Sequence, residues 1–144
     1  MTSLGFCLCL ERALNDYNVA FVTLQTILIV DDERAVREFV AAALTRAGFL
    51  VRTACSAEEA LDLEAHHPVD LLVTDVILPN INGPELAERI RQRSPQTRVL
   101  FISGYPGNAL TAHHLRGGSA FLAKPFGTTT LIERVHEVLN PQRQ

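Results

Sequence analysis

The chain has 144 residues, of which 47% are hydrophobic and 20% charged, and its net charge is −3. This length supports one domain with a hydrophobic core and is short for two, and the composition argues against wholesale disorder. The slightly acidic balance lacks the basic patch expected of a protein that binds nucleic acid directly, so we expect no such contact.

Residues 1–25 lie outside the pattern that dominates the rest of the chain, and we predict an N-terminal extension of unknown role. Its apolar start lacks a basic segment and is interrupted by Glu11 and Arg12, so we expect neither a signal peptide nor a membrane anchor. Three explanations stay open. The extension is a helix for self-association, the remnant of a linker from a larger protein, or the result of a start codon wrongly assigned upstream of the true one. The odd number of cysteines, three, favours a reducing cytoplasm.

From residue 26 onward, short apolar runs alternate with helical patterns. The runs are rich in β-branched residues and predict buried strands at 26–30, 50–53, 71–74, 98–102 and 120–123. Strands that alternate with helices form right-handed βαβ units. The sequence therefore predicts an α/β fold, a doubly wound five-stranded parallel sheet flanked by five helices.

The helices are predicted from the spacing of apolar residues and from residues that typically cap helix ends. The first carries one apolar stripe (Val36, Phe39, Val40, Ala43 and Leu44) and ends at Gly48 in a left-handed cap. The second begins with the capping box Ser56 to Glu59, and the third ends near residue 93. A weak fourth helix is expected at 109–115 and the last at about 131–139. We interpret four arginines as one solvated face: Arg89, Arg91, Arg93 and Arg98.

Polar side chains stand where four of these strands end: Asp31 and Asp32, Asp75, Ser103, and Lys124. The carboxyl ends of parallel strands meet at one edge of the sheet, which is where open α/β sheets bind ligands. Carboxylates gathered there repel one another by roughly 4 kcal/mol per pair at 4 Å and an effective dielectric of 20. Mg²⁺ would relieve that repulsion, since it prefers oxygen ligands and also binds phosphate. We therefore predict a magnesium-assisted phosphoryl site in which Asp75 is the nucleophile.

Four segments in this order resemble the response-regulator receiver family of two-component signalling: 29–33, 74–79 with Gly83, 102–104, and 121–126. The resemblance covers about residues 26–139. It implies a flavodoxin-like sheet of order 2-1-3-4-5, a receiver domain at 26–140 and a short tail at 141–144.

The resemblance also implies a role for each matching position. Asp75 would accept the phosphoryl group and join Asp32, Asp31 and the Ile77 backbone carbonyl around Mg²⁺. Ser103 and Lys124 would bind phosphate, Ser103 and Phe121 would form the switch pair, and the bond before Pro125 would be cis. Ile77 and Tyr105 flank the route of hydrolytic water, so we expect slow to moderate loss of phosphate.

These roles predict a cytoplasmic phosphorylation switch that catalyses only its own phosphorylation and dephosphorylation. The phosphodonor would be a sensor histidine kinase or a histidine phosphotransfer protein. A downstream protein would bind the face made by the helix at 109–115, the fifth strand and the last helix, with the chain a monomer or weak homodimer. Because the chain ends just after the last helix, we expect a stand-alone receiver. An excised receiver of a hybrid sensor kinase and a phosphate sink remain alternatives.

Two other functional classes fit the residues poorly. A flavin-binding protein of this fold needs a loop after the first strand that donates hydrogen bonds to phosphate, and here that loop is acidic, from Asp31 to Glu33. A phosphatase resembling the haloacid dehalogenases would carry its nucleophile after the first strand, whereas Asp75 follows the third.

Overall fold

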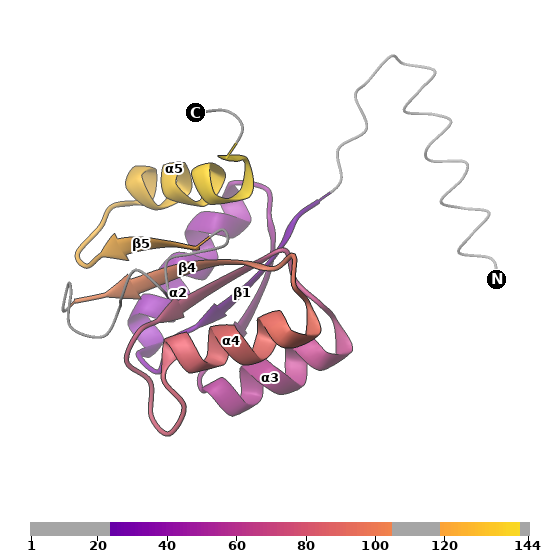
Figure 1. Ribbon diagram of the computed structural model, residues 1–144. Helices are drawn as coiled ribbons and strands as arrows, with labels where there is room; N and C mark the ends of the chain where they lie inside the picture. The colour runs from indigo at the N-terminus through magenta and orange to yellow at the C-terminus, as the bar shows by residue number, and fades with distance from the viewer. Residues whose placement is uncertain (1–23, 105–118, 142–144) are drawn as a thin grey trace, which may run out of the picture.

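The computed structural model describes residues 24–104 and 119–141 (Figure 1). Its strands are β1 (Thr26–Val30), β2 (Leu50–Ala54), β3 (Leu71–Asp75), β4 (Arg98–Ser103) and β5 (Ser119–Ala123). Its helices are α2 (Arg34–Arg46), α3 (Ala57–His66), α4 (Gly83–Arg93) and α5 (Thr128–Leu139). Residues 1–23, the helix predicted at 109–115 and Tyr105 lie outside the described residues.

All five strands pair in parallel, in the order β2-β1-β3-β4-β5. This confirms the predicted fold class and the strand order that the family resemblance implied. The described residues contain four of the five predicted helices. No helix within residues 24–104 and 119–141 is long and apolar enough to cross a membrane.

Helices cover both faces of the sheet, with α2 and α5 on one face and α3 and α4 on the other (Figure 1). Within β1, Ile27 and Ile29 join the core under α2 and α5, while Leu28 and Val30 join the opposite core. Successive side chains of a strand point to opposite faces, so a strand buried on both sides reads as a continuous apolar run.

The helix ends follow local sequence signals. Gly48 has a φ of 99°, and the Gly48 and Phe49 amides donate to the Thr45 and Leu44 carbonyls, which closes α2 in a Schellman motif. The Ser56 hydroxyl accepts the Glu59 amide at 3.2 Å and caps α3. The Glu59 carboxylate instead accepts a hydrogen bond from the Cys55 thiol at 3.4 Å, so only half of the predicted capping box forms.

Phe39 is not part of the core, although the helical stripe predicted it there. It is 37% exposed and packs edge-on against Phe126, with ring centroids 6.0 Å apart. Only the stripe at Val40, Ala43 and Leu44 is fully covered by the sheet. Phe39 lies at the margin of the stripe, where the loop after β5 replaces the sheet as its neighbour.

Three strands, β2, β3 and β4, extend one residue beyond their predicted ends, and the added residues of β3 and β4 are polar. Asp75 pairs in register with Ile102, and Ser103 pairs with Ala123. Both polar residues are therefore the last residues of β3 and β4 rather than the first residues of loops, so the sheet itself holds their backbones.

Candidate functional site

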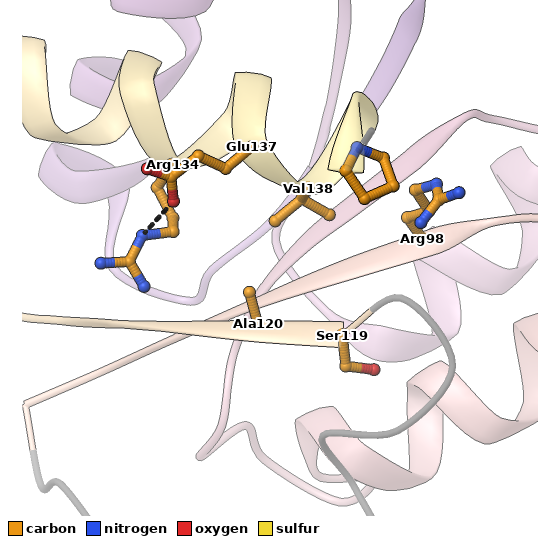
Figure 2. A pocket seen from close by; sticks show the side chains of 7 residues that line it. Arg98, Ser119, Ala120, Arg134, Glu137 and Val138 are labelled. Carbon is orange, nitrogen blue, oxygen red and sulfur yellow. Dashed lines mark ion pairs between the residues drawn. The ribbon is translucent and has the colours of Figure 1, made fainter. Parts of the chain in front are cut away.

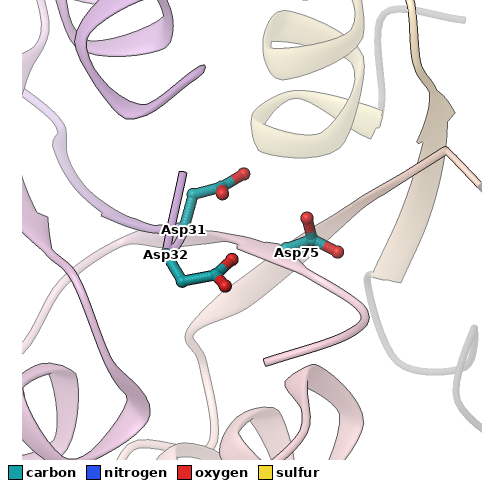
Figure 3. Close-up of side chains that lie close together, drawn as sticks. All are labelled: Asp31, Asp32 and Asp75. Carbon is teal, nitrogen blue, oxygen red and sulfur yellow. The ribbon is translucent and has the colours of Figure 1, made fainter. Parts of the chain in front are cut away.

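Three aspartates converge beyond the carboxyl ends of two neighbouring strands (Figure 3). Asp31 and Asp32 directly follow β1, and Asp75 ends the adjacent strand β3. Each offers a carboxylate oxygen, and these atoms all lie within 4.8 Å of one another. Asp31 is buried and Asp32 is exposed, so the cluster lies on the boundary between protein and solvent.

Backbone amides orient two of the three carboxylates. The Glu33 amide donates to Asp31 Oδ1 at 2.8 Å, and the Ile77 amide donates to Asp75 Oδ1 at 2.9 Å. Burial raises the pKa of Asp31 above its ordinary value, and the raised pKa persists despite the Glu33 amide and the nearby Lys124. Ionised Asp31 is thus held at a cost, which a cation at the site would offset.

Lys124 joins the buried Asp31 to the half-buried Asp75. Its Nζ donates to Asp75 Oδ2 at 2.9 Å and to Asp31 Oδ2 at 3.4 Å. Burial alone would lower the pKa of Lys124, but the two carboxylates outweigh it, so the pKa is raised and the side chain stays charged. The Lys124 amide donates to the Ser103 carbonyl at 2.9 Å, and the Lys124–Pro125 bond is cis, as the resemblance implied.

A cavity of about 420 Å³ opens over the cluster, lined by Asp32, Glu33, Asp75, Ile77, Gly104 and Lys124. Ile77 is 52% exposed at this opening. The structure therefore brings the predicted residues Asp32, Asp75, Ile77 and Lys124 around one space, which is open to solvent.

Ser103 and Phe121 lie beside this cavity rather than in its lining. Ser103 is 1% exposed at the end of β4. Phe121 is half-buried in β5 and packs against the core under α3 and α4, and its carbonyl accepts a hydrogen bond from Arg134 at 2.8 Å. The two residues of the predicted switch pair therefore lie on neighbouring strands, β4 and β5.

The residues present suit a hard dication. Three carboxylates supply oxygen atoms, the donors that Mg²⁺ prefers, and no sulfur or imidazole group joins them in the described cluster. Asp31, Asp32, Asp75 and the Ile77 carbonyl are the groups that would hold it. Lys124 balances only part of the negative charge, which leaves a reason for a cation to bind.

Two residues at the site were missed by the sequence analysis. Arg37, which lies outside the apolar stripe predicted for its helix, is half-buried, and its Nη1 donates to the Asp31 carbonyl oxygen at 2.7 Å. Gly83, noted only as part of a motif, lies against the backbone of Asp75. The pattern of apolar residues along a helix cannot predict either contact, because each joins a helix residue to the backbone at the end of a strand.

The protein-family model described as 'response regulator receiver domain' matches residues 27–136 of the chain. The sensor kinase CckA of Brucella abortus is 38% identical over 121 residues, which cover 81% of this chain and 13% of that protein. The response regulator receiver protein CpdR of the same organism is 30% identical over 117 residues, covering 81% of this chain and 98% of the relative.

A solved structure of the receiver domain from the hybrid histidine kinase CckA is 40% identical, with a TM-score of 0.68, covering 79% of this chain and 98% of that one. The chain spans only 13%, 24% and 28% of three of its curated relatives, so their whole activities do not transfer with the match. The family model covers most of the chain, from β1 to α5. The chain belongs to the response regulator receiver domain family.

Proposed function

We propose that this chain is a phosphorylation switch that accepts a phosphoryl group on Asp75 from a phosphohistidine of a sensor kinase or phosphotransfer protein. The observation that carries the proposal is the Lys124 contact with Asp75 at 2.9 Å, within a cluster of three carboxylates at the carboxyl edge of the sheet. A nucleophilic carboxylate beside one cation and an open cavity is the arrangement that phosphoryl transfer needs.

The chemistry balances with residues of the chain and the donor. A carboxylate oxygen of Asp75 attacks phosphorus, the new P–O bond forms, and the P–N bond to the donor imidazole breaks with its electron pair left on nitrogen. Lys124 donates to the oxygens that gain charge, while the Ile77 amide keeps the carboxylate oriented. Mg²⁺, when bound, neutralises the charge on the phosphoryl oxygens.

The output would run from Ser103 to Phe121. The Ser103 hydroxyl would donate to the phosphate, and Phe121 would move inward on the neighbouring strand. Arg134 of α5 holds the Phe121 carbonyl and pairs with Glu137 at 3.3 Å beside a hollow of about 210 Å³ between β5 and α5 (Figure 2). A downstream protein would bind the face that includes β5, α5 and the helix predicted at 109–115.

The chain would work in the cytoplasm as a monomer or weak homodimer, would catalyse only its own phosphorylation and dephosphorylation, and would bind no nucleic acid directly. The exposed Ile77 at the cavity opening supports the slow to moderate loss of phosphate expected above. Loss within seconds in magnesium buffer would contradict that rate.

Labelling by a small acyl phosphate tests the central proposal. The parent should gain one phosphoryl group from acetyl phosphate only when Mg²⁺ is present, and Asp75→Asn should gain none. Asp62→Asn, which changes an exposed carboxylate on α3, is the matched control and should label like the parent. Equal labelling of the parent and Asp75→Asn, or no labelling of either, would reject the assignment.

A second candidate function is that of a receiver within a phosphorelay, as in a hybrid sensor kinase. The 38% identity to CckA supports it. Such a receiver should pass its phosphoryl group back to a histidine phosphotransfer protein within minutes. A terminal switch or phosphate sink should instead lose phosphate only to water.

A further inference from the structure

Gly83, the first residue of α4, lies directly against the backbone that carries Asp75. A β-carbon at position 83 would stand 2.2 Å from the Asp75 carbonyl oxygen, and real β-carbons essentially never come within 3.0 Å of such an atom. The other described glycines, Gly48, Gly104 and Gly127, have no heavy atom within 4 Å of the same position. Gly83 is therefore required for space.

This contact closes the loop that follows the proposed phosphoacceptor. The Gly83 amide donates to the Val76 carbonyl at 2.8 Å, so the loop of residues 76–82 begins and ends at the same place. Within the loop, the Ile77 amide holds Asp75 Oδ1 at 2.9 Å, while Lys124 holds Oδ2. One of the two contacts that orient the carboxylate is thus set by where the loop closes.

We propose that Gly83 is a positioning residue for phosphoryl transfer: its bare α-carbon lets α4 close onto Asp75, which sets the Ile77 peptide and the direction of the carboxylate. This inference rests on the proposed role of Asp75. Any side chain at position 83 must move α4 or the Asp75 backbone by about 1 Å, and a misplacement of that size at a reacting group can cost about 100-fold in rate.

Gly83→Ala tests the inference, and Gly127→Ala is its matched control. Gly127 is the N-cap of α5, and a β-carbon there would have no heavy atom within 4 Å. Gly83→Ala should label Asp75 from acetyl phosphate about 100-fold more slowly. It should also bind Mg²⁺ alone at least about tenfold more weakly, and its Ile77 amide should exchange at least about tenfold faster relative to the amides of β1. Gly127→Ala should stay within about twofold of the parent in all three measurements.

A merely structural role for Gly83 predicts something different. The variant would melt at a lower temperature and all globally exchanging amides would accelerate together, while the folded fraction would keep its Mg²⁺ affinity and its labelling rate. That result would overturn the inference.

A second pair of variants decides the matter if Gly83→Ala does not fold. Asn82→Ala removes the side-chain cap of α4, which accepts the Glu85 amide at 2.9 Å, and Ser56→Ala removes the corresponding cap of α3. Both lose one cap of similar strength. Asn82→Ala should speed exchange of the Ile77 amide and weaken Mg²⁺ binding, each by about threefold, whereas Ser56→Ala should change neither. Equal effects of the two substitutions would overturn the inference.

The parent separates the two possible failures. A parent that does not label on Asp75 rejects the proposed function itself. A parent that labels on Asp75, together with variants at positions 82 and 83 that match their controls, rejects only the role of Gly83.

Discussion

Lys124 is the only lysine of the chain, and its ammonium contacts both Asp31 and Asp75. Lys124→Gln should slow labelling by acetyl phosphate about 100-fold, since it removes a preorganised charge from the position where phosphoryl oxygens gain charge. Rates measured with saturating Mg²⁺ would check this.

The matched control is Arg34→Gln, which removes one positive charge from the exposed first turn of α2. It should label at the parent rate. A Lys124→Gln rate within a few-fold of the parent would show that the ammonium has no part in the transfer.

Asp31 should make the stability of the metal-free protein depend on pH. Its pKa is raised in the folded state, chiefly by burial, so the folded state binds this proton more tightly than the unfolded chain does. Ionisation therefore opposes folding: the penalty is absent below the unfolded value of 3.8, grows as pH rises toward the raised value, and is constant above it. In EDTA at pH 7, Asp31→Asn should melt at a higher temperature than the parent.

The advantage of Asp31→Asn should shrink as the pH falls toward 4. Asp62→Asn, on the exposed side of α3, serves as the control for loss of a carboxylate. A parent that is more stable than Asp31→Asn at pH 7 without metal would contradict the prediction that ionised Asp31 destabilises the folded protein. Mg²⁺ binding by Asp31→Asn should be weaker, because Asp31, whose ionised form costs stability, is also one of the proposed metal ligands.

Between elements, α3 and α4 are tied by a buried carboxylate. Glu64 of α3 is 1% exposed, its Oε1 accepts the Ser94 hydroxyl at 2.7 Å, and its Oε2 pairs with Arg93 at 2.8 Å. Arg93 itself stays exposed, as expected of a solvated arginine, although its guanidinium also pairs with this buried carboxylate. The expectation that four arginines form one solvated face is wrong for Arg91, which is half-buried and donates to Ser119 at the start of β5.

Arg93→Ala should lower the free energy of unfolding by about 1–3 kcal/mol, since it leaves the Glu64 charge buried with one hydrogen bond. Arg89→Ala, which breaks only the exposed pair with Glu85 on the same helix, should cost about 0.5 kcal/mol or less. Urea unfolding at pH 7 measures both. Equal losses would mean that the Glu64 pair carries no more weight than a surface pair.

For the whole molecule, the proposed metal site predicts a link between Mg²⁺ concentration and stability. Mg²⁺ at about 100 times its dissociation constant should raise the free energy of unfolding by about 2.7 kcal/mol, because it binds the folded state alone. EDTA should reverse the gain. Asp32→Ala should abolish it with little change in the metal-free protein, since Asp32 is exposed. An undiminished magnesium effect in Asp32→Ala would place the metal elsewhere.

The parallel sheet and the residues at the ends of its strands could be predicted from sequence pattern, while the strand order came from the family resemblance. Apolar runs separated by helical patterns dictate parallel pairing, and parallel pairing brings Asp31, Asp75 and Lys124 to one edge. That inference needs only the period of each element and the chemistry of the residue that ends it. The small errors, such as Asp75 and Ser103 ending their strands, arise because register with a neighbour extends a strand beyond its own pattern.

What the sequence by itself determined, then, is the sheet, its order through the family resemblance, and the set of groups at the acidic edge. Only the tertiary structure decided which atoms touch: Lys124 on Asp31 across 93 positions, Arg37 on the Asp31 carbonyl, Gly83 on the Asp75 carbonyl, and Glu64 buried beneath Arg93. The physical reason is that the spacing of apolar residues along the chain shows only which face of a helix or strand is apolar. Contacts between side chains and distant backbone depend instead on how loops close and how helices pack against one another.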